Sequence, residues 1–347
     1  MQLSKLRSAT VAAAVTVAVA AAVTGAATGA QAGGGYGYTA TGTVFYPNPV
    51  QQLGLQNLAD DKDADSPAFA AAYRRVTLTD LDGSGTLTGA YVAVKSKTGQ
   101  RAQAVNGAYA DWHRDKDQFE QVMGYYWVTT AQHYLQHLGF GSTLRPVNQR
   151  QIELRIDQFG GDNSFFRDDK ANITLGKGGV DDAEDAEVIL HEYGHSVQDG
   201  QVPGFGTSME AGAIGEGFGD YLSIVVTDWT TGVPTSTAEA CVADWDSVSY
   251  TAAPHCLRRL DGTKVYPADV RGEVHADGEI WSRALWDIHN ALGDVKGSTV
   301  IIEAQFDFAV DTSFHDAAVT TVATARRLYG NAAAAQVQAA FTARGIL

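Results

Sequence analysis

The chain has 347 residues, of which 45% are hydrophobic and 19% charged, a balance typical of a soluble globular protein long enough for two lobes. The formal net charge is −15, and no stretch of the sequence forms a basic stripe. An acidic chain repels anionic partners, so we expect no nucleic-acid binding and no stable membrane association.

The N-terminus has the pattern of a secretory signal peptide. Lys5 and Arg7 precede an Ala/Val-rich run over residues 9–23, and Ala30-Gln31-Ala32 fits a cleavage site. The run is short for a membrane anchor. We therefore expect residues 1–32 to be removed and the mature protein to be secreted and extracellular. Losing their two positive charges takes the net charge from −15 to −17.

Alternating polarity predicts strands over residues 74–79 and 86–94, and Asp82-Gly83-Ser84-Gly85 between them has the composition of a turn. We expect these segments to pair as a β-hairpin. The same turn resembles the start of a calcium-binding loop, but Tyr91 stands where such a loop needs its closing Glu, which favours the hairpin. Further strands are expected over residues 41–46, 151–156 and 171–175.

A helical pattern over residues 117–138 carries His133 and His137, whose spacing suits metal ligands. No carboxylate follows at a suitable position, and aromatic residues surround both histidines. We expect them to be structural residues of a packed helix.

Residues 181–187 include five acidic side chains and precede the next helix. Carboxylates at a helix start stabilise the positive end of its dipole. The same group also suits a structural Ca²⁺, and both interpretations stay open.

That helix contains His191-Glu192-Tyr193-Gly194-His195. Residues four apart share one helix face, so His191 and His195 can present ring nitrogens to a single ion. Two neutral imidazoles suit Zn²⁺, and Glu192 can reach a water molecule beside the ion. The alternative is a surface helix with two ordinary histidines, because the motif alone also arises by chance.

The second half of the chain is mainly helical in pattern. Helices are expected over residues 208–226, 278–292, 298–310, 313–329 and 331–343. The first of these carries Glu216, 21 residues after His195, and Asp220 one turn later. Small and apolar residues surround both acids, which is unusual for solvated charges. We expect Glu216 to be the third ligand and Asp220 to orient a ligand histidine.

The order of elements predicts an α+β architecture in two lobes. A sheet-bearing N-terminal lobe with the metal helix is expected over residues 33–200, and a mainly α-helical lobe over residues 201–347. Cys241 and Cys256 are the two cysteines of a chain that we expect to be exported, which favours a disulfide between them over metal binding.

These motifs together resemble the gluzincin zinc metallopeptidases, in particular the thermolysin-like and fungalysin-like groups. His191-Glu192-x-x-His195, followed by Gly212-Ala213-Ile214-x-Glu216-x-x-x-Asp220, is similar to the metal-binding signature of these families. Residues 163–176 are similar to their substrate-binding edge strand, and residues 272–281 to the segment with the cleft histidine. The four motifs occur in the families' order over residues 163 to 278, which implies a two-lobed thermolysin-like fold.

The resemblance implies a mechanism. His191, His195 and Glu216 would bind one catalytic Zn²⁺ and leave a fourth position for water. Glu192 would act as the general base and pass the proton to the leaving amine. His275 would donate a hydrogen bond to the oxyanion of the transition state.

The resemblance also implies substrate contacts. Asn163, Ser164 and Phe165 would hold the peptide as an added strand. Arg258 is similar to the arginine beside the pocket for the residue after the cut, although Arg259 matches equally well on spacing. The sequence departs from the families in two places: Gly215 replaces an Asn often found before the third ligand, and no oxyanion tyrosine occurs in the loop 201–207, where Phe205 is the nearest aromatic.

The function expected from these features is that of a secreted, monomeric zinc endopeptidase acting on polypeptides. A zinc aminopeptidase is a second hypothesis, because Met209-Glu210-Ala211 faintly resembles an amine-binding motif of that class. A third is a non-catalytic secreted binding protein on a degenerate peptidase fold. The presence of both Glu192 and His275 favours catalysis over this third hypothesis.

Overall fold

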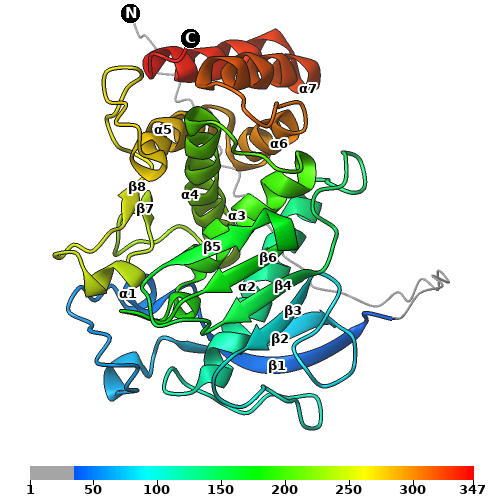
Figure 1. Ribbon diagram of the computed structural model, residues 1–347, viewed down its shortest axis with the longest axis vertical. Coiled ribbons are helices and arrows are strands. Elements are labelled where there is room, and N and C mark those ends of the chain that lie inside the picture. Colours follow the sequence, from blue (N-terminus) through cyan, green and yellow to red (C-terminus); the bar gives the residue numbers. More distant parts are fainter. Residues whose placement is uncertain (1–34) are drawn as a thin grey trace, which may run out of the picture. The chain divides into compact units, whose positions relative to one another are not determined.

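The computed structural model describes residues 35–347, and the predicted signal peptide lies outside these residues (Figure 1). Gly35–Leu347 form one compact unit. Within this part of the chain, no helix combines the length and the apolar character needed to cross a bilayer.

The strands of the described residues form three sheets. They are β1 (Tyr38–Phe45) and β2 (Tyr73–Leu81) in the first sheet, β3 (Val92–Ser96), β4 (Ile152–Ile156), β5 (Ser164–Arg167) and β6 (Asn172–Leu175) in the second, and β7 (Cys241–Val242) and β8 (Arg258–Arg259) in the third.

The four-stranded sheet has the order β3-β4-β6-β5, in which β3, β4 and β6 are parallel and β5 runs antiparallel at the edge. The predicted hairpin between residues 74–79 and 86–94 is wrong. β2 pairs with β1, whereas β3 pairs with β4, so the two strands belong to different sheets. Across the turn at Asp82–Gly85, one isolated antiparallel bridge joins Leu81 and Gly89, and the chain then continues into the second sheet.

The helices follow the expected order with shifted ends, except for the short α1, which was not predicted. They are α1 (Pro49–Leu53), α2 (Asp117–His137), α3 (Ala186–Gln201), α4 (Met209–Thr231), α5 (Val274–Leu292), α6 (Asp294–Gln305) and α7 (Phe314–Ala343). The helices predicted over 313–329 and 331–343 form α7, which is interrupted at Gly330, where φ is 84°. Helix α5 begins four residues before its predicted start at Gly278, so it includes His275.

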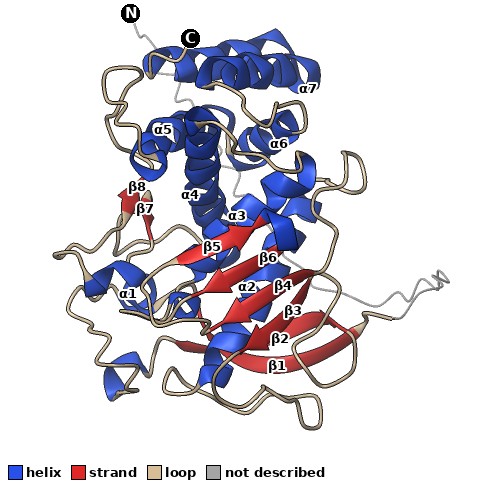
Figure 2. Cartoon of the chain, viewed as in Figure 1, coloured by secondary structure: helices blue, strands red, loops and turns tan. Residues whose placement is uncertain are grey.

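Helix α2 packs across both larger sheets, as Figure 2 shows. Its contact with β4 depends on Gly124, because a Cβ atom there would lie 2.4 Å from a side-chain carbon of Leu154. His133 contacts Asp80 at 2.9 Å, and the His137 ring packs against Trp229, as expected of structural histidines.

Figure 2 shows strands β1 to β6 below α4, helices α5, α6 and α7 towards its upper end, and the short strands β7 and β8 beside it. One cluster of buried apolar side chains runs through this whole unit, from Ala40 to Ile346. The α+β class with a mainly helical C-terminal part is confirmed. The boundary near residue 200 stays a prediction.

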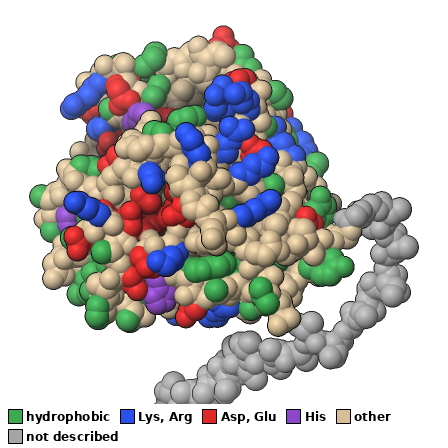
Figure 3. Space-filling view, turned by 60° about the horizontal axis from the view of Figure 1, so that its bottom comes forward, with side chains coloured by type: hydrophobic (Ala, Val, Ile, Leu, Met, Phe, Trp, Pro, Cys, Tyr) green, Lys and Arg blue, Asp and Glu red, His purple; other side chains and the backbone are tan. Residues whose placement is uncertain are grey.

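Acidic side chains gather in one patch on the face shown in Figure 3, with Lys and Arg side chains around it. Such a surface agrees with the formal net charge of −15.

Candidate metal centre

Three side chains from two neighbouring helices converge on one point. His191 and His195 project from α3, and Glu216 projects from α4. One ligand atom of each residue lies within 4.8 Å of the others. The Glu216 carboxylate lies beside both rings, with its Oε2 3.1 Å from His191 Nε2 and its Oε1 3.6 Å from His195 Nε2.

This donor set fits a zinc ion. Ligand atoms about 2.0–2.1 Å from a tetrahedral zinc are about 3.3 Å apart, close to the separations of 3.1 and 3.6 Å found here. Two imidazole nitrogens and one carboxylate oxygen match catalytic zinc sites that keep one position open. Burial opposes a positive charge on His191, but hydrogen bonds to Asp220 and Glu216 outweigh it and raise the pKa to about 10. The carboxylates of Asp220 and Glu216 therefore favour positive charge on the His191 ring, whereas burial lowers the pKa of His195 to about 4.

Small residues bring the two helices close enough for these side chains to meet. A Cβ atom at Gly194 of α3 would lie 2.9 Å from the Cα of Gly219 in α4. At Gly219, a Cβ atom would lie 2.8 Å from Nδ1 of His191. Helix α3 itself begins at Asp185, whose carboxylate accepts a hydrogen bond from the N–H of Glu187 at 2.9 Å.

Asp220 lies behind His191, one turn after Glu216 on α4. Its Oδ1 is 2.8 Å from His191 Nδ1, which leaves Nε2 of that ring facing Glu216. The guanidinium of Arg258 binds the same carboxylate, from Nη2 to Oδ1 at 2.6 Å and from Nε to Oδ2 at 2.7 Å. Burial opposes ionisation of Asp220, but Arg258 and His191 outweigh it and lower the pKa. An ionised Asp220 can hold the His191 ring in one orientation.

His195 lacks the neighbour that an Asn at position 215 would provide. A Cβ atom at Gly215 would lie 3.5 Å from Nδ1 of His195 and 3.3 Å from Oε1 of Gln198, so both polar atoms face this gap. Within the described residues, neither the amide oxygen nor the amide nitrogen of Gln198 has a hydrogen-bond partner. No sequence pattern marked Gln198, although it lies on α3 only three residues after His195.

Glu192 is buried and lines two cavities that meet at the metal centre. Burial raises its pKa to about 7, outweighing the opposing effect of His191. A carboxylate with that pKa can both take up and release a proton near neutral pH.

His275 lies in the first turn of α5 and is half-exposed. Its Nδ1 is 2.6 Å from Oε1 of Glu273, and its Nε2 is 3.4 Å from Oε2 of Glu216. Glu273 also accepts hydrogen bonds from the backbone at the start of α5. This contact fixes the ring so that Nε2 faces the cavities.

The edge strand β5 borders both cavities. Asn163, Ser164, His191, Glu192 and His275 line both of them, which have volumes of about 420 and 400 Å³. Phe165 and His195 line the second cavity, and Arg258 lines the first. Glu216 also lines the second cavity. Of the predicted site residues, Asp220 alone lines neither cavity, and it contacts His191 from behind.

Two buried carboxylates of the first cavity, Asp182 and Asp246, were not identified as site residues. Asp182 belongs to the acidic run before α3, where the sequence offered a helix-dipole or calcium interpretation. Asp246 is 64 residues further along the chain, and no local pattern links the two.

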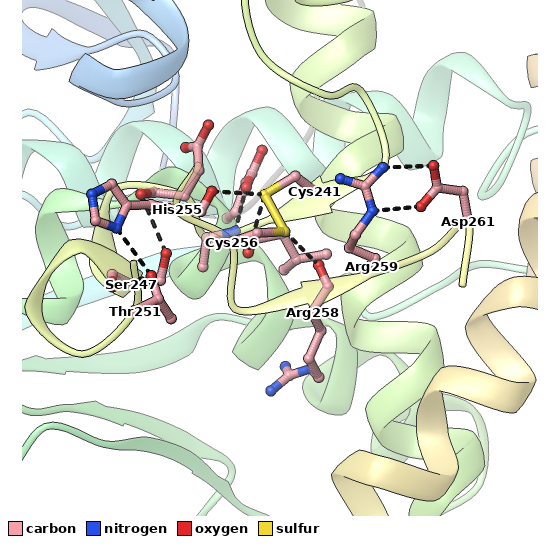
Figure 4. Close-up of a disulfide and its surroundings, with 12 residues drawn as sticks. Cys241, Ser247, Thr251, His255, Cys256, Arg258, Arg259 and Asp261 are labelled. Atoms are coloured by element: carbon pink, nitrogen blue, oxygen red, sulfur yellow. Dashed lines mark hydrogen bonds and ion pairs between the residues drawn. A yellow bond between two sulfur atoms is a disulfide. The ribbon is translucent and has the colours of Figure 1, made fainter. Parts of the chain in front are cut away.

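A disulfide joins Cys241 and Cys256, as predicted, and it ties the short strands β7 and β8 together (Figure 4). Figure 4 also shows that the side chains of the two candidate arginines, Arg258 and Arg259, point in different directions. Arg259 turns to Asp261, with which it forms an exposed ion pair at 2.6 Å, whereas Arg258 points to the other side of β8. Of the two, Arg258 lines the cavity.

Comparisons with known proteins agree with this geometry. Residues 177–346, which contain all three candidate ligands, match the fungalysin metallopeptidase family (M36). The chain is therefore similar to this family over 170 of its 347 residues. The matched part contains the metal centre, the disulfide and helices α4 to α7.

Curated proteins similar to this chain include the extracellular metalloproteinase 2 of Trichophyton tonsurans, 28% identical over 138 residues, and the extracellular metalloproteinase mep of Aspergillus niger, 28% identical over 137 residues. These matches cover 35% and 34% of this chain, and the chain spans about a fifth (20%) of each relative. The precursor of protealysin, a metalloproteinase from Serratia proteamaculans, has a similar fold. Its TM-score is 0.52 at 18% identity, with 88% of this chain and 99% of that chain covered.

Proposed function

We propose that this protein is a secreted zinc endopeptidase. The observation that carries the proposal is the convergence of His191, His195 and Glu216 in a cleft that also contains the buried Glu192 and the edge strand β5. An edge strand offers unpaired backbone groups, so a peptide can be bound beside it as an additional strand.

Zinc held by His191, His195 and Glu216 would acidify a water molecule and polarise the peptide carbonyl. Glu192 would accept the proton of that water and deliver it to the leaving nitrogen, because its carboxylate lines both cavities beside the ligand His191. His275 would donate a hydrogen bond from Nε2 to the oxygen on which negative charge develops.

The remaining residues would position these groups. Asp220 would keep His191 in the tautomer that presents Nε2. Asn163, Ser164 and Phe165 would hold the substrate along β5, and Arg258 would support Asp220 while its side chain forms part of the cavity wall.

The test compares the zinc content and casein cleavage of the wild type and of Glu192→Ala. The variant should keep one zinc per chain and lose nearly all turnover, because it lacks the proton acceptor but keeps the ligands. Glu153→Ala is a suitable control, since Glu153 is a carboxylate of β4 paired with Lys95 on the neighbouring strand. Full turnover by Glu192→Ala would contradict the role given to Glu192.

An endopeptidase is favoured over an aminopeptidase because two cavities share His191, Glu192 and His275 and each also extends to residues that the other lacks, which suits a chain that continues past the cut bond in both directions. Casein and aminoacyl reporter substrates separate these activities. If zinc-loaded protein cuts neither substrate, the binding-protein hypothesis replaces both. The expected monomer is checked by light scattering.

Secretion is proposed from the sequence of residues 1–32 and from the extracellular relatives. Protein recovered from the culture medium should begin near Gly33. The structural calcium ion stays a prediction from the acidic run at residues 181–187. Added Ca²⁺ should raise the unfolding temperature of zinc-loaded protein if the ion binds.

A further inference from the structure

Three carboxylates from separate parts of the chain line the first cavity. Asp162 precedes β5, Asp182 precedes α3, and Asp246 follows β7. One carboxylate oxygen of each lies within 4.8 Å of the others. Asp182 is 2% exposed and Asp246 is 5% exposed, so two carboxyl groups lie almost entirely out of water.

In each of these two buried carboxylates, one oxygen accepts a hydrogen bond and the other has no hydrogen-bond partner among the described residues. Oδ2 of Asp182 accepts a hydrogen bond from the hydroxyl of Ser164, and Oδ2 of Asp246 accepts one from Tyr250. Within the described residues, Oδ1 of Asp182 and Oδ1 of Asp246 are buried without any partner. A buried polar atom without a partner is unfavourable, and structures retain such atoms where a ligand completes them.

The other charged groups of this cavity do not neutralise the two carboxylates. Arg258 donates hydrogen bonds from Nε and Nη2 to the carboxylate of Asp220. Glu187 accepts hydrogen bonds from Gln51 and from the N–H of Ala243, and it adds negative charge. Burial raises the pKa of Asp182 to about 8 and that of Asp246 to about 7. A cation bound between them would remove this penalty.

The carboxylates share their cavity with the reacting groups. His191 and Glu192 line it, as do Asn163 and Ser164 at the start of the edge strand. The side chain of a residue next to the cut bond would therefore enter this cavity. Val188, Val242 and Leu257 form apolar parts of its wall, which suit the methylene groups of a long basic side chain.

We propose that this cavity selects a lysine or arginine side chain of the substrate residue next to the cut bond, with Asp182 and Asp246 as the residues that determine this specificity. The inference rests on the proposed peptidase function. An ammonium group has three N–H donors, which match the free oxygens of Asp182 and Asp246 and the carboxylate of Asp162. A guanidinium group can bridge the same oxygens.

A divalent metal is the competing occupant. Calcium takes about six to eight oxygen ligands, whereas this group offers few, because the hydroxyls of Ser164 and Tyr250 already use one oxygen of each buried carboxylate. A basic side chain needs fewer acceptors, and the cavity connects it directly to the centre that would cut the chain.

The first experiment profiles the cleavage of a peptide library by zinc-loaded wild-type protein. Lys and Arg should be enriched at one position adjoining the cut. In matched peptides, kcat/KM for Lys should exceed that for norleucine, which lacks the ammonium group, by about 10- to 100-fold. This is the difference expected from hydrogen bonds between charged groups. Aliphatic or aromatic enrichment at both adjoining positions would overturn the inference. An absence of any cleavage would instead refute the proposed function.

The second experiment assigns the preference to the carboxylates. Asp182→Asn and Asp246→Asn should each reduce the ratio of kcat/KM for Lys to that for norleucine by about tenfold. Asp311→Asn removes an exposed charge outside the cavity and should leave the ratio unchanged. An unchanged ratio in both cavity variants would refute the assignment. Ca²⁺ binding to the wild type that Asp182→Asn abolishes, without any basic preference, would identify a metal site instead.

Discussion

At the scale of single residues, His191 is held from both sides. Its Nε2 faces Glu216, and its Nδ1 contacts Asp220, which Arg258 in turn binds through two nitrogens. A ligand histidine fixed in this way needs no reorientation when an ion binds. The strength of metal binding should therefore depend on Asp220, although Asp220 itself does not face the ion.

We predict that Asp220→Asn weakens zinc binding by about 10- to 100-fold, the usual effect of removing a group that orients a ligand. The substitution preserves size but cannot accept from both His191 and Arg258 as a carboxylate does. Competition with a chelator, on protein shown to be folded by circular dichroism, measures the change. Asp311→Asn should bind zinc like the wild type, and equal affinity in Asp220→Asn would refute the orienting role.

A second residue-scale prediction concerns Asp228, far along α4 from the ligand Glu216. Burial, and then the charges of Glu239 and Asp294, raise its pKa to about 7 from an ordinary value of 3.8. The folded protein thus holds a proton that the unfolded chain has released between these pH values. The stabilisation is complete below about pH 4 and is lost as pH rises through about 7.

Asp228→Asn keeps the neutral form at every pH. We therefore expect the wild type to lose more free energy of unfolding than this variant between pH 5 and pH 8, as measured by urea denaturation. Asp311→Asn controls for the change in net charge. Parallel pH profiles of the wild type and Asp228→Asn would contradict this prediction.

Residue-scale chemistry was accessible from the sequence where it depended on local spacing. His191, Glu192 and His195 occupy neighbouring turns of one helix, and Glu216 and Asp220 lie one turn apart on the next, so helical periodicity alone relates them. Asp246 was not accessible in this way, because it reaches the cavity only after the chain has passed through β7. Gln198 was missed because nothing in its neighbours marks it as facing a gap at Gly215.

At the scale of elements, glycines set the distances between the helices around the site. A Cβ atom at Gly217 of α4 would lie 2.5 Å from the carbonyl oxygen of Gly278 in α5 and 2.8 Å from the backbone nitrogen of Ser282. Both neighbours are backbone atoms, which cannot turn aside. Helix α4 therefore contacts α3 and α5 along backbone surfaces, and it holds Glu216 between His191 and His275.

We predict that Gly217→Ala destabilises the protein by about 1–3 kcal/mol, as overpacking usually does, and moves Glu216 relative to His191. Urea denaturation measures the first effect, and zinc affinity measures the second. Gly262→Ala is a matched control, because the nearest atom to its Cβ would be 3.5 Å away, an ordinary contact. If Gly217→Ala had the same free energy of unfolding as the wild type, α4 and α5 would be able to move apart without loss of stability, which would contradict the prediction.

Helices were easier to predict than strand pairing, for a physical reason. A helix closes its hydrogen bonds within four residues, so α2, α3 and α4 appear where their local patterns place them. A strand forms its hydrogen bonds with another strand, which can be distant in the sequence. Two strands separated by a turn therefore need not pair with each other. β2 and β3 flank Asp82–Gly85, yet β3 pairs with β4 about 60 residues later, because the parallel sheet buries it beneath α2.

At the scale of the whole molecule, several hydrogen bonds join residues before the predicted boundary near residue 200 to residues after it. Tyr46 donates a hydrogen bond to the carbonyl of Thr230 at 2.6 Å, and the indole of Trp245 donates one to Glu184 at 3.2 Å. The N–H of Ala243 donates to Glu187 at 2.6 Å. Since the apolar cluster is also continuous, each predicted lobe completes the buried surface of the other.

We therefore predict that residues 35–347 unfold in a single cooperative transition. Calorimetry should give a van't Hoff enthalpy equal to the calorimetric enthalpy, provided that unfolding is reversible. Residues 33–200 and 201–347 produced separately should remain unfolded. In the first fragment, the buried carboxylates of Glu187 and Glu184 would lack the hydrogen-bond donors that Ala243 and Trp245 supply. Exposing these carboxylates to water would instead expose the apolar core around them. Two resolved transitions, or a folded fragment, would show that the two lobes are independent units joined at the metal helix.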